Sequence, residues 1–326
     1  MALTADTFTW VATLVRAKSA IQLTPGKEYL VESRLLPLAR AAGLPGVDAY
    51  VQKVRSGRDL VAERAVVEAL TTNETSWFRD NAPFLALRSR LLPELMAARN
   101  RPVHLRFWSA ACSTGQEPYS LAMTLVDILP PTVTFEILAT DLSEQVLARA
   151  RTGRYSQLEI NRGLPAPLMV RHFGRAGAEW EVSADLRARV TFRAHNLLDS
   201  PPAGRFDVIL LRNVLIYFDL PTKRSILGRM RQVLVPDGSL LLGAAETTIG
   251  VDASWERVAV GSASVYRPAG GAATSAAAVR QPAVAAALAD RLTAARPAST
   301  TSTAPHTPRV TSTPAPRLGT RPGAAR

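Results

Sequence analysis

Two carboxylates stand where an α/β protein would hold a nucleoside-like ligand. Glu117 follows a turn of small residues that runs from Ser109 to Gly115, and Asp141 ends a second apolar segment. A strand, a tight turn and a helix start let the backbone approach a ligand closely, with free N–H groups directed at it. Gly115 is the only glycine of the turn, so the G-x-G-x-x-G dinucleotide fingerprint is absent.

The charge of the two carboxylates narrows the class of ligand. Glu117 at a helix start would repel a phosphate, but it would accept a cationic or zwitterionic group such as the methionine part of S-adenosylmethionine. Asp141 at a strand tip is placed to hold a pair of ribose hydroxyls. Plain structural roles stay open, because the turn could be an ordinary connection and Asp141 an N-cap, although Ser143 can supply that cap instead.

Hydrophobic periodicity predicts the elements that carry these groups. Residues 103–108 alternate as a strand does, residues 117–129 place apolar side chains on one helical face, and residues 133–141 form a second strand. The run 206–211, which is apolar except for Asp207, is typical of a central parallel strand that is buried on both faces. We therefore predict an α/β fold with a doubly wound, mainly parallel sheet and an antiparallel edge strand.

Changes in pattern divide the chain into three parts. Residues 1–95 have helical apolar spacing, which predicts a helical N-terminal domain with a linker. Residues 96–267 hold the α/β domain, and a small β subdomain is predicted to be inserted at about 154–193, where glycines, prolines and short strand-like pieces break the alternation. Residues 268–326 are rich in Ala, Pro, Thr and Arg and predict a disordered tail.

Composition excludes several classes of protein. The single cysteine, Cys112, excludes a disulfide framework and a cysteine metal cluster, and the four histidines lack ligand spacing, so no metal site is predicted. There is no signal peptide and no apolar run that could span a bilayer, which predicts a cytoplasmic protein without membrane insertion. Residues from Pro268 onward contain seven arginines and one aspartate and so hold half of the net charge of +12, which leaves the rest only mildly basic.

Five motifs occur in an order that resembles one enzyme family. They are T-T-N-E-T-S-W-F-R at 71–79, S-A-A-C-S-T-G-Q-E-P-Y-S-L-A-M at 109–123, the strand tip at Asp141, H-N-L-L at 195–198 and R-N-V-L-I-Y-F-D at 212–219. From about residue 8 to residue 267, the chain resembles the chemotaxis receptor glutamate O-methyltransferases, the CheR family. The resemblance implies a class I S-adenosylmethionine-dependent methyltransferase domain, which is Rossmann-like, with a helical N-terminal domain and an inserted β subdomain.

The resemblance also implies the residues of the site and the partners. By motif position, the S-adenosylmethionine pocket would be lined by Asn73, Thr75, Arg79, Glu117, Asp141, Asn196, Leu197, Leu211, Arg212 and Asn213. Arg79 and Tyr217 would be the catalytic pair beside the transferred methyl group. The implied partners are the cytoplasmic helical domains of methyl-accepting chemotaxis receptors, met by a monomer at receptor arrays. The β subdomain is shorter than in relatives that dock on a receptor's C-terminal peptide, so the resemblance does not extend to that docking.

The residues suit this chemistry on physical grounds. A glutamate side chain is already ionised at pH 7, so methylating it needs no general base. Its carboxylate and the sulfonium lose their charges together, which leaves positioning as most of the task. An arginine such as Arg79 can hold a carboxylate by paired hydrogen bonds, and the hydroxyl of Tyr217 can fix the other reactant. We expect Glu117 on the amino group of the cofactor and Asp141 on its ribose.

Two other functions fit the sequence less well than this interpretation, and the tail has two possible roles. A degenerate module that only senses the cofactor is disfavoured by the intact Arg79, Asp141 and Tyr217. A nucleic-acid methyltransferase is disfavoured because the excess charge lies largely in the tail and no base-reading motif is present, so no nucleic-acid partner is expected. The tail is either a passive linker or a tether that raises the local concentration of the enzyme near an acidic partner.

Overall fold

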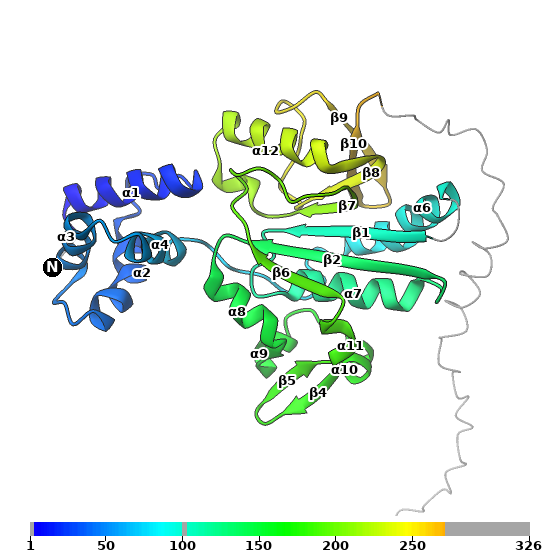
Figure 1. Ribbon diagram of the computed structural model, residues 1–326, viewed down its shortest axis with the longest axis horizontal. Coiled ribbons are helices and arrows are strands. Elements are labelled where there is room, and N and C mark those ends of the chain that lie inside the picture. The colour runs from blue at the N-terminus through cyan, green and yellow to red at the C-terminus, as the bar shows by residue number, and fades with distance from the viewer. Residues whose placement is uncertain (1–2, 100–102, 271–326) are drawn as a thin grey trace, which may run out of the picture. The chain divides into compact units, whose positions relative to one another are not determined.

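The structure is a computed structural model that describes residues 3–99 and 103–270. The predicted disordered tail therefore lies, from residue 271 on, outside the described residues. Figure 1 labels most of the helices and strands. Among the helices of the described ranges, none combines the length and the apolar character that crossing a bilayer requires.

Four helices form the N-terminal part of the chain and confirm the predicted helical domain. They are α1 (Ala5–Ser19), α2 (Glu28–Ala41), α3 (Val47–Gly57) and α4 (Leu60–Ala69), drawn in blue in Figure 1. Thr4 and Asp59 are the N-caps of α1 and α4, since the side chain of each accepts backbone N–H from the first turn of its helix. Val15, Leu35 and Val66 are fully buried in the core that these helices share.

A seven-stranded sheet forms the centre of the second part. Its order is β6-β2-β1-β7-β8-β10-β9, and β1 pairs in parallel with both β2 and β7. The strands are β1 (Val103–Ala110), β2 (Val133–Asp141), β6 (Val190–Ala194), β7 (Phe206–Leu211), β8 (Leu234–Leu242), β9 (Trp255–Val260) and β10 (Ala263–Pro268). The predicted mainly parallel sheet is confirmed, and the carboxyl ends of β1, β2, β6 and β7 meet along one edge.

The antiparallel strand is not at the edge, where the sequence placed it. Strand β10 is antiparallel to both β8 and β9, so it lies one position in, and β9 is the edge strand. The reason is burial. Val265 and Tyr266 of β10 are 0% and 2% exposed, whereas β9 has Glu256, Arg257 and Ala259 exposed to solvent.

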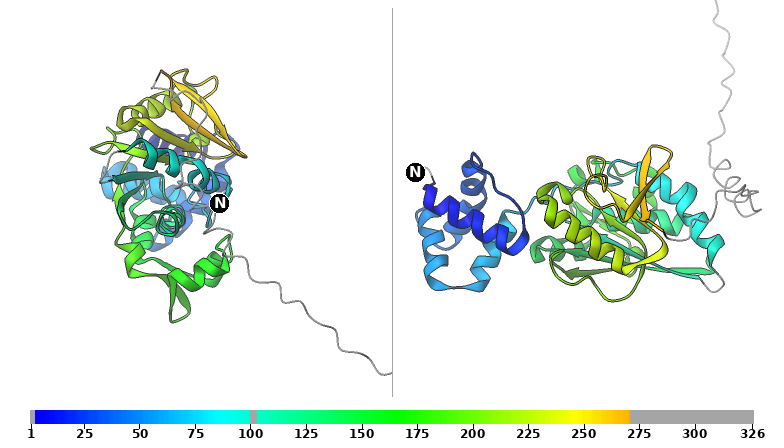
Figure 2. Two further views of the ribbon diagram at one scale, coloured as in Figure 1. Left: turned by 90° about the vertical axis from the view of Figure 1, so that its right-hand side faces the viewer. Right: turned by 90° about the horizontal axis from the view of Figure 1, so that it is seen from above.

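Helices cover both faces of the sheet, as Figure 2 shows from two further directions. On one face, Leu210 of β7 shares a core with Leu121 of α7 (Gln116–Ile128), and on the other, Ile209 shares a core with Ile226 of α12 (Leu220–Val233). Successive side chains of a strand point to opposite faces, which accounts for this division. The remaining helical segments outside the insertion are α5 (Ala82–Ala86), η1 (Leu87–Leu91), α6 (Leu92–Ala98), α8 (Glu144–Thr152) and η2 (Leu215–Tyr217).

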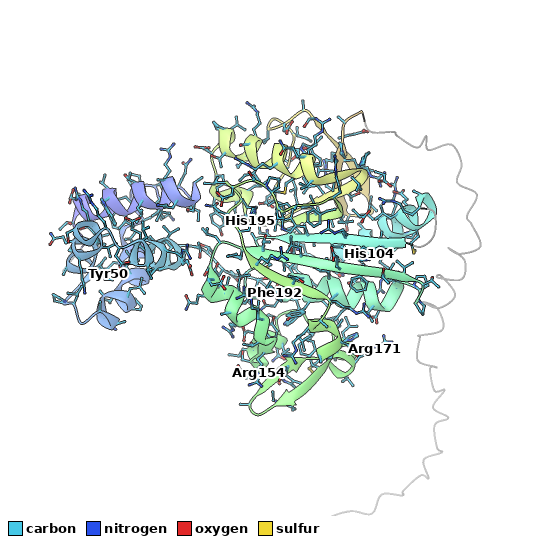
Figure 3. The ribbon with its side chains drawn as sticks, in the orientation of Figure 1. Tyr50, His104, Arg154, Arg171, Phe192 and His195 are labelled. Atoms are coloured by element: carbon cyan, nitrogen blue, oxygen red, sulfur yellow. The ribbon has the colours of Figure 1, made fainter. Side chains whose placement is uncertain are left out.

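The predicted β subdomain is confirmed, with helices that the sequence did not predict. Its antiparallel sheet has the order β3-β5-β4, formed by β3 (Arg154–Tyr155), β4 (Phe173–Ala176) and β5 (Glu179–Val182). Between and after these strands lie α9 (Gln157–Ile160), α10 (Ala166–His172) and α11 (Ala184–Arg187). A capping box of Ser156 and Glu159 closes the first turn of α9, which is how so short a helix forms. Figure 3 labels Arg154 and Arg171 in this subdomain.

Candidate active site

A cavity opens at the carboxyl ends of the central strands. It is lined by Ser19 at the end of α1 and Ile21 just after it, by residues 71–75 and Arg79 after α4, by residues 111–113 and Glu117 around the β1 turn, by Asp141, Leu142 and residues 195–197 at the tips of β2 and β6, and by residues 212–214, Tyr217 and Phe218 after β7. Such a position, beyond the carboxyl ends of parallel strands, is where α/β folds bind their ligands. Nine of the ten predicted cofactor residues, and Tyr217, line this one cavity.

The turn after β1 is built from left-handed backbone. The φ angles of Ala111, Ser113 and Gly115 are 67°, 50° and 95°, which is rare for residues other than glycine. A Cβ atom at Gly115 would lie 3.0 Å from the Cβ of Ala150 and 3.0 Å from the hydroxyl of Tyr155, so the close approach requires glycine there. The turn is thus held open to the cavity at a cost in backbone strain, as is common at ligand sites.

Asp141 joins the turn after β1 to the tip of β2. Its Oδ2 accepts the backbone N–H of Ser113 at 2.8 Å, and its Oδ1 accepts the N–H of Ser143 at 3.0 Å. Burial raises the pKa of this carboxyl, against the effect of the two hydrogen bonds. Ser143, whose hydroxyl accepts the N–H of Val146, is the N-cap of α8, as the sequence allowed. Asp141 therefore faces the cavity with acceptor capacity to spare.

Glu117 and Arg212 form a buried ion pair in the wall of the cavity. The Oε2 of Glu117 accepts Nη1 of Arg212 at 2.9 Å, and its Oε1 accepts the hydroxyl of Ser109 at 2.8 Å. Nη2 of Arg212 donates at 2.7 Å to the carbonyl of Arg79 and at 2.7 Å to the carboxylate of Asp80. The Arg212 side chain is only 1% exposed, and its hydrogen bonds link Glu117 at the start of α7 to the segment of Arg79 and Asp80. Each oxygen of Glu117 keeps a lone pair for a ligand's ammonium group.

Arg79 is carried on a strained segment. Its neighbours Phe78, Asp80 and Asn81 have φ angles of 48°, 63° and 42°. Nη1 of Arg79 donates to the carbonyl of Glu74 at 3.1 Å, and within the described residues no carboxylate forms an ion pair with it. A guanidinium that lines a cavity without a carboxylate partner can bind an anionic ligand by paired hydrogen bonds.

Tyr217 and the H-N-L-L segment complete the walls. Tyr217 lies at the end of η2, and its carbonyl accepts the N–H of Gln22 at 3.3 Å. The amide of Asn196 donates to the carbonyl of Lys18 at 2.7 Å. His195, labelled in Figure 3, packs its ring edge-on to Trp108, and burial lowers its pKa. Segments far apart in the sequence therefore meet at the cavity.

The structure does not bring Leu211 to the cavity. This predicted cofactor residue is the last of β7, is fully buried, and shares a core with residues of α12. The cause is strand alternation, because Leu211 points to the same face as Ile209. Its neighbour Arg212 lies beyond the strand and lines the cavity instead.

Sequence reasoning missed several lining residues. Ser19 ends α1 and Ile21 lies in the connection that follows, and nothing in their own types signals a ligand site. His195 directly precedes the predicted Asn196, so the motif itself was the available signal. Among the described residues, no group of three or more His, Cys, Asp or Glu side chains is placed to hold a metal ion.

Comparison with known proteins gives matches over both parts of the chain. The family model "CheR methyltransferase, SAM binding domain" matches residues 73–263, and "CheR methyltransferase, all-alpha domain" matches residues 6–71. Chemotaxis protein methyltransferase 1 of Pseudomonas aeruginosa is 43% identical over 254 residues, which are 76% of this chain and 92% of that protein. Chemotaxis protein methyltransferase 1 of Vibrio cholerae is 41% identical over 261 residues, which are 78% and 93%. Among solved structures, the glycopeptide N-methyltransferase MtfA with sinefungin aligns with a TM-score of 0.33 at 17% identity, over 53% of this chain and 52% of that one.

Proposed function

Because this chain belongs to the CheR methyltransferase family and binds S-adenosylmethionine, we propose that it transfers the cofactor's methyl group to glutamate side chains of chemotaxis receptors. The product would be a glutamate methyl ester, formed during sensory adaptation. The proposed substrates are the cytoplasmic helical domains of the receptors, which the enzyme would meet as a monomer at receptor arrays. The names of its relatives, which are chemotaxis protein methyltransferases, support this direction.

One observation carries the proposal. Arg79 lines the cofactor cavity together with Tyr217, and in the described part of the chain no carboxylate pairs with its guanidinium. A buried or half-buried arginine usually has a carboxylate partner, since a desolvated charge is costly. The incoming glutamate would supply that partner in a bidentate arrangement that fixes its orientation.

The cavity also fits the cofactor. Asp141 and Glu117 are buried acceptors that face it with lone pairs unused by the protein, which matches ribose hydroxyls and an ammonium group respectively. Asn73, Thr75, Asn196, Leu197, Arg212 and Asn213 line the same cavity and are proposed to complete the pocket. When bound, S-adenosylmethionine supplies a methyl group on a positively charged sulfur.

In the proposed reaction, a carboxylate oxygen of the glutamate forms a bond to the methyl carbon while the carbon–sulfur bond breaks and its electron pair stays on sulfur. No proton is transferred, so no residue has to act as a base. Arg79 would hold the carboxylate in line, and the hydroxyl of Tyr217 would fix the position of the reacting groups. Positioning of this kind supplies the rate, because the uncatalysed partners rarely meet in the reactive geometry.

The experiment follows a labelled methyl group. The purified protein is incubated with S-adenosylmethionine radiolabelled on its methyl group and with membranes that hold the receptors of the same cell. We expect label in the receptor bands and its release as volatile methanol in mild base, since carboxyl esters hydrolyse there. The matched control is the Asp141→Ala protein, which should transfer little label. Base-stable label, or label in nucleic acid alone, would refute the proposal.

A further inference from the structure

A buried carboxylate outside the proposed catalytic set holds one wall of the cavity. Glu246 follows β8 and is 8% exposed. Its Oε2 accepts the backbone N–H groups of Asn213 and Gly243, both at 2.7 Å, and its Oε1 accepts those of Val214 at 2.8 Å and Leu215 at 2.7 Å. Four backbone donors thus converge on one side chain.

The arrangement resembles an anion-binding site that is occupied by a side chain of the protein itself. Successive backbone N–H groups that point inward form a concave nest for negative charge. Here the anion is the side chain of Glu246, and within the described residues no Lys, Arg or His forms an ion pair with it. Hydrogen bonds to an ionised acceptor are about twice as strong as neutral ones, so the four together hold the segment firmly.

The held segment is the one that carries Asn213 and Tyr217. Strands β7 and β8 end at Leu211 and Leu242, so the four N–H groups lie beyond the ladder that would otherwise satisfy them. Asn213 has a φ of 58°, in the left-handed region that strains a residue with a side chain. The third donor, Leu215, begins the single turn of η2, which ends at Tyr217.

Gly243 is a second feature built for this contact. A Cβ atom at that position would lie 2.7 Å from Oε2 of Glu246 and 2.7 Å from Nδ2 of Asn213. Only glycine lets the two segments approach so closely. The carboxylate, the glycine and the left-handed asparagine therefore form one unit.

We propose that Glu246 is a positioning residue for methyl transfer, which acts by holding the segment that presents Asn213 and Tyr217 to the cavity. The inference rests on the proposed function in that it takes Tyr217 to be part of the reacting site. It adds a residue that does not line the cavity itself.

Glu246→Gln is the main test, and Glu256→Gln on β9 is its control. Glutamine keeps one acceptor oxygen, and its NH₂ group would face one pair of N–H donors and displace them. Since a misplacement of about 1 Å can cost about 100-fold in rate, we expect kcat to fall about 100-fold. The Kd of S-adenosylmethionine should rise by less than about tenfold, because Asp141 and Glu117 are untouched. Glu256→Gln removes the same charge at an exposed position, and this variant should keep the wild-type kcat and the wild-type Kd of S-adenosylmethionine.

A double variant separates positioning from general stability. If Glu246 acts through Tyr217, then adding Tyr217→Phe to Glu246→Gln should lower kcat by much less than Tyr217→Phe lowers it in the wild type. If the fold-losses in kcat of the two single variants instead multiply in the double variant, the inference is overturned. So would a Glu246→Gln enzyme with wild-type kcat.

Hydrogen exchange on the wild-type protein needs neither a substrate nor a folded variant. The amides of Asn213, Val214, Leu215 and Gly243 should exchange as slowly as those of strand interiors, although they lie in loops. Exchange at the rate of an open loop would overturn the inference even if glutamate methylation is confirmed. Wild-type protein that forms no methyl ester, but protects these amides, would instead refute the proposed function alone.

Discussion

Asp141 and Glu117 are both buried carboxylates of the cavity, but different groups hold them. Asp141 is bound by the backbone of Ser113 and Ser143, so it also fixes the turn after β1. Glu117 is bound by the side chains of Ser109 and Arg212, so it also neutralises a buried arginine. The two carboxylates that we propose to bind the cofactor therefore also hold the wall of the cavity in place.

The proposed role of Asp141 in cofactor binding predicts what its removal should do. We expect Asp141→Ala to raise the Kd of both S-adenosylmethionine and its demethylated product by about 10- to 100-fold, since hydrogen bonds to a charged group contribute about 1.5–3 kcal/mol. Isothermal titration calorimetry measures both constants. The exposed Asp185→Ala on α11 is the matched control and should bind as the wild type does. An unchanged Kd in Asp141→Ala would remove this carboxylate from the site.

The motifs and the family resemblance predicted ten of the 22 residues that line the cavity, but not the residues that support the lining. Asn73, Arg79 and Asp141 could be found because they stand in motifs at the ends of predicted elements. Leu211 does not line the cavity, because the point where a strand leaves the sheet decides which side chain turns to the cavity. Glu246 could not be found, since its role depends on contacts with residues about thirty positions away.

At the scale of elements, the turn after β1 depends on one glycine. Gly115→Ala would place a methyl group against Ala150 and Tyr155 at a φ of 95°, so we expect a loss of about 1–3 kcal/mol in unfolding free energy and weaker cofactor binding. Gly174→Ala on β4 is the control, because nothing lies within 4 Å of its Cβ position. Urea denaturation compares the two variants. Equal stability of both would show that the turn tolerates a side chain.

Helix α10 anchors the inserted subdomain to α7 through an acid–base contact. Oδ1 of Asp127, on α7, lies 2.6 Å from Nη1 of Arg171 and 3.8 Å from Nε2 of His172. Figure 3 labels Arg171 at this place. Burial lowers the pKa of His172 below its usual range, and Asp127 opposes that effect only in part. The histidine is therefore neutral in the folded protein at a pH where the unfolded chain would already protonate it.

The sign of this shift gives a pH dependence. Because the pKa of His172 is lower in the folded protein than in the unfolded chain, its contribution to the free energy of unfolding is complete above the usual histidine pKa. That contribution is lost as the pH falls through the pKa of His172 in the folded protein. We expect His172→Gln to lose less stability than the wild type between neutral and mildly acid pH. Thermal melts across that range measure the difference. Parallel melting curves for the two proteins would contradict the assignment.

Long periodic elements were predictable and short ones were not. The strands β1, β2 and β7 and the helix α7 follow from apolar patterns of six or more residues. Helices α9 and α11 have four residues each, too few for a periodic signal. Helix α9 depends on its capping box, and α11, which has no side-chain cap, buries Leu186. The position of β10 depends on pairing across the sheet, which no local pattern records.

At the scale of the whole molecule, the cavity depends on the N-terminal helices. Ser19 and Ile21 line it, Lys18 accepts the amide of Asn196, and Glu68 of α4 accepts the hydroxyl of Ser143 at 3.0 Å. These contacts bring the helical part against the tips of β2 and β6. The catalytic part would therefore be incomplete without residues from the first helices.

The predicted tail, residues 268–326, of which Pro268 is the last residue of β10, carries the last sequence prediction. A truncated variant that ends at Pro268 should melt at the wild-type temperature and methylate a soluble receptor fragment at the wild-type rate, because the tail's composition cannot build a core. If the tail is a tether, the truncated enzyme should be slower on intact receptor arrays only, and the deficit should shrink as salt screens the arginines. Equal rates on arrays would favour a passive linker. Failure of the truncated protein to fold would refute both roles.

The central claim is that the cavity holds a carboxylate against Arg79 while the methyl group is transferred. The most direct measurement is the rate of base-labile methyl ester formation on the receptor by Arg79→Ala at saturating S-adenosylmethionine, beside its Kd for the cofactor. We predict that kcat falls by about 100-fold or more, as on removal of one donor that stabilises the reacting charge, while the Kd changes much less. An Arg79→Ala enzyme with wild-type turnover, or a loss explained wholly by cofactor affinity, would contradict the account.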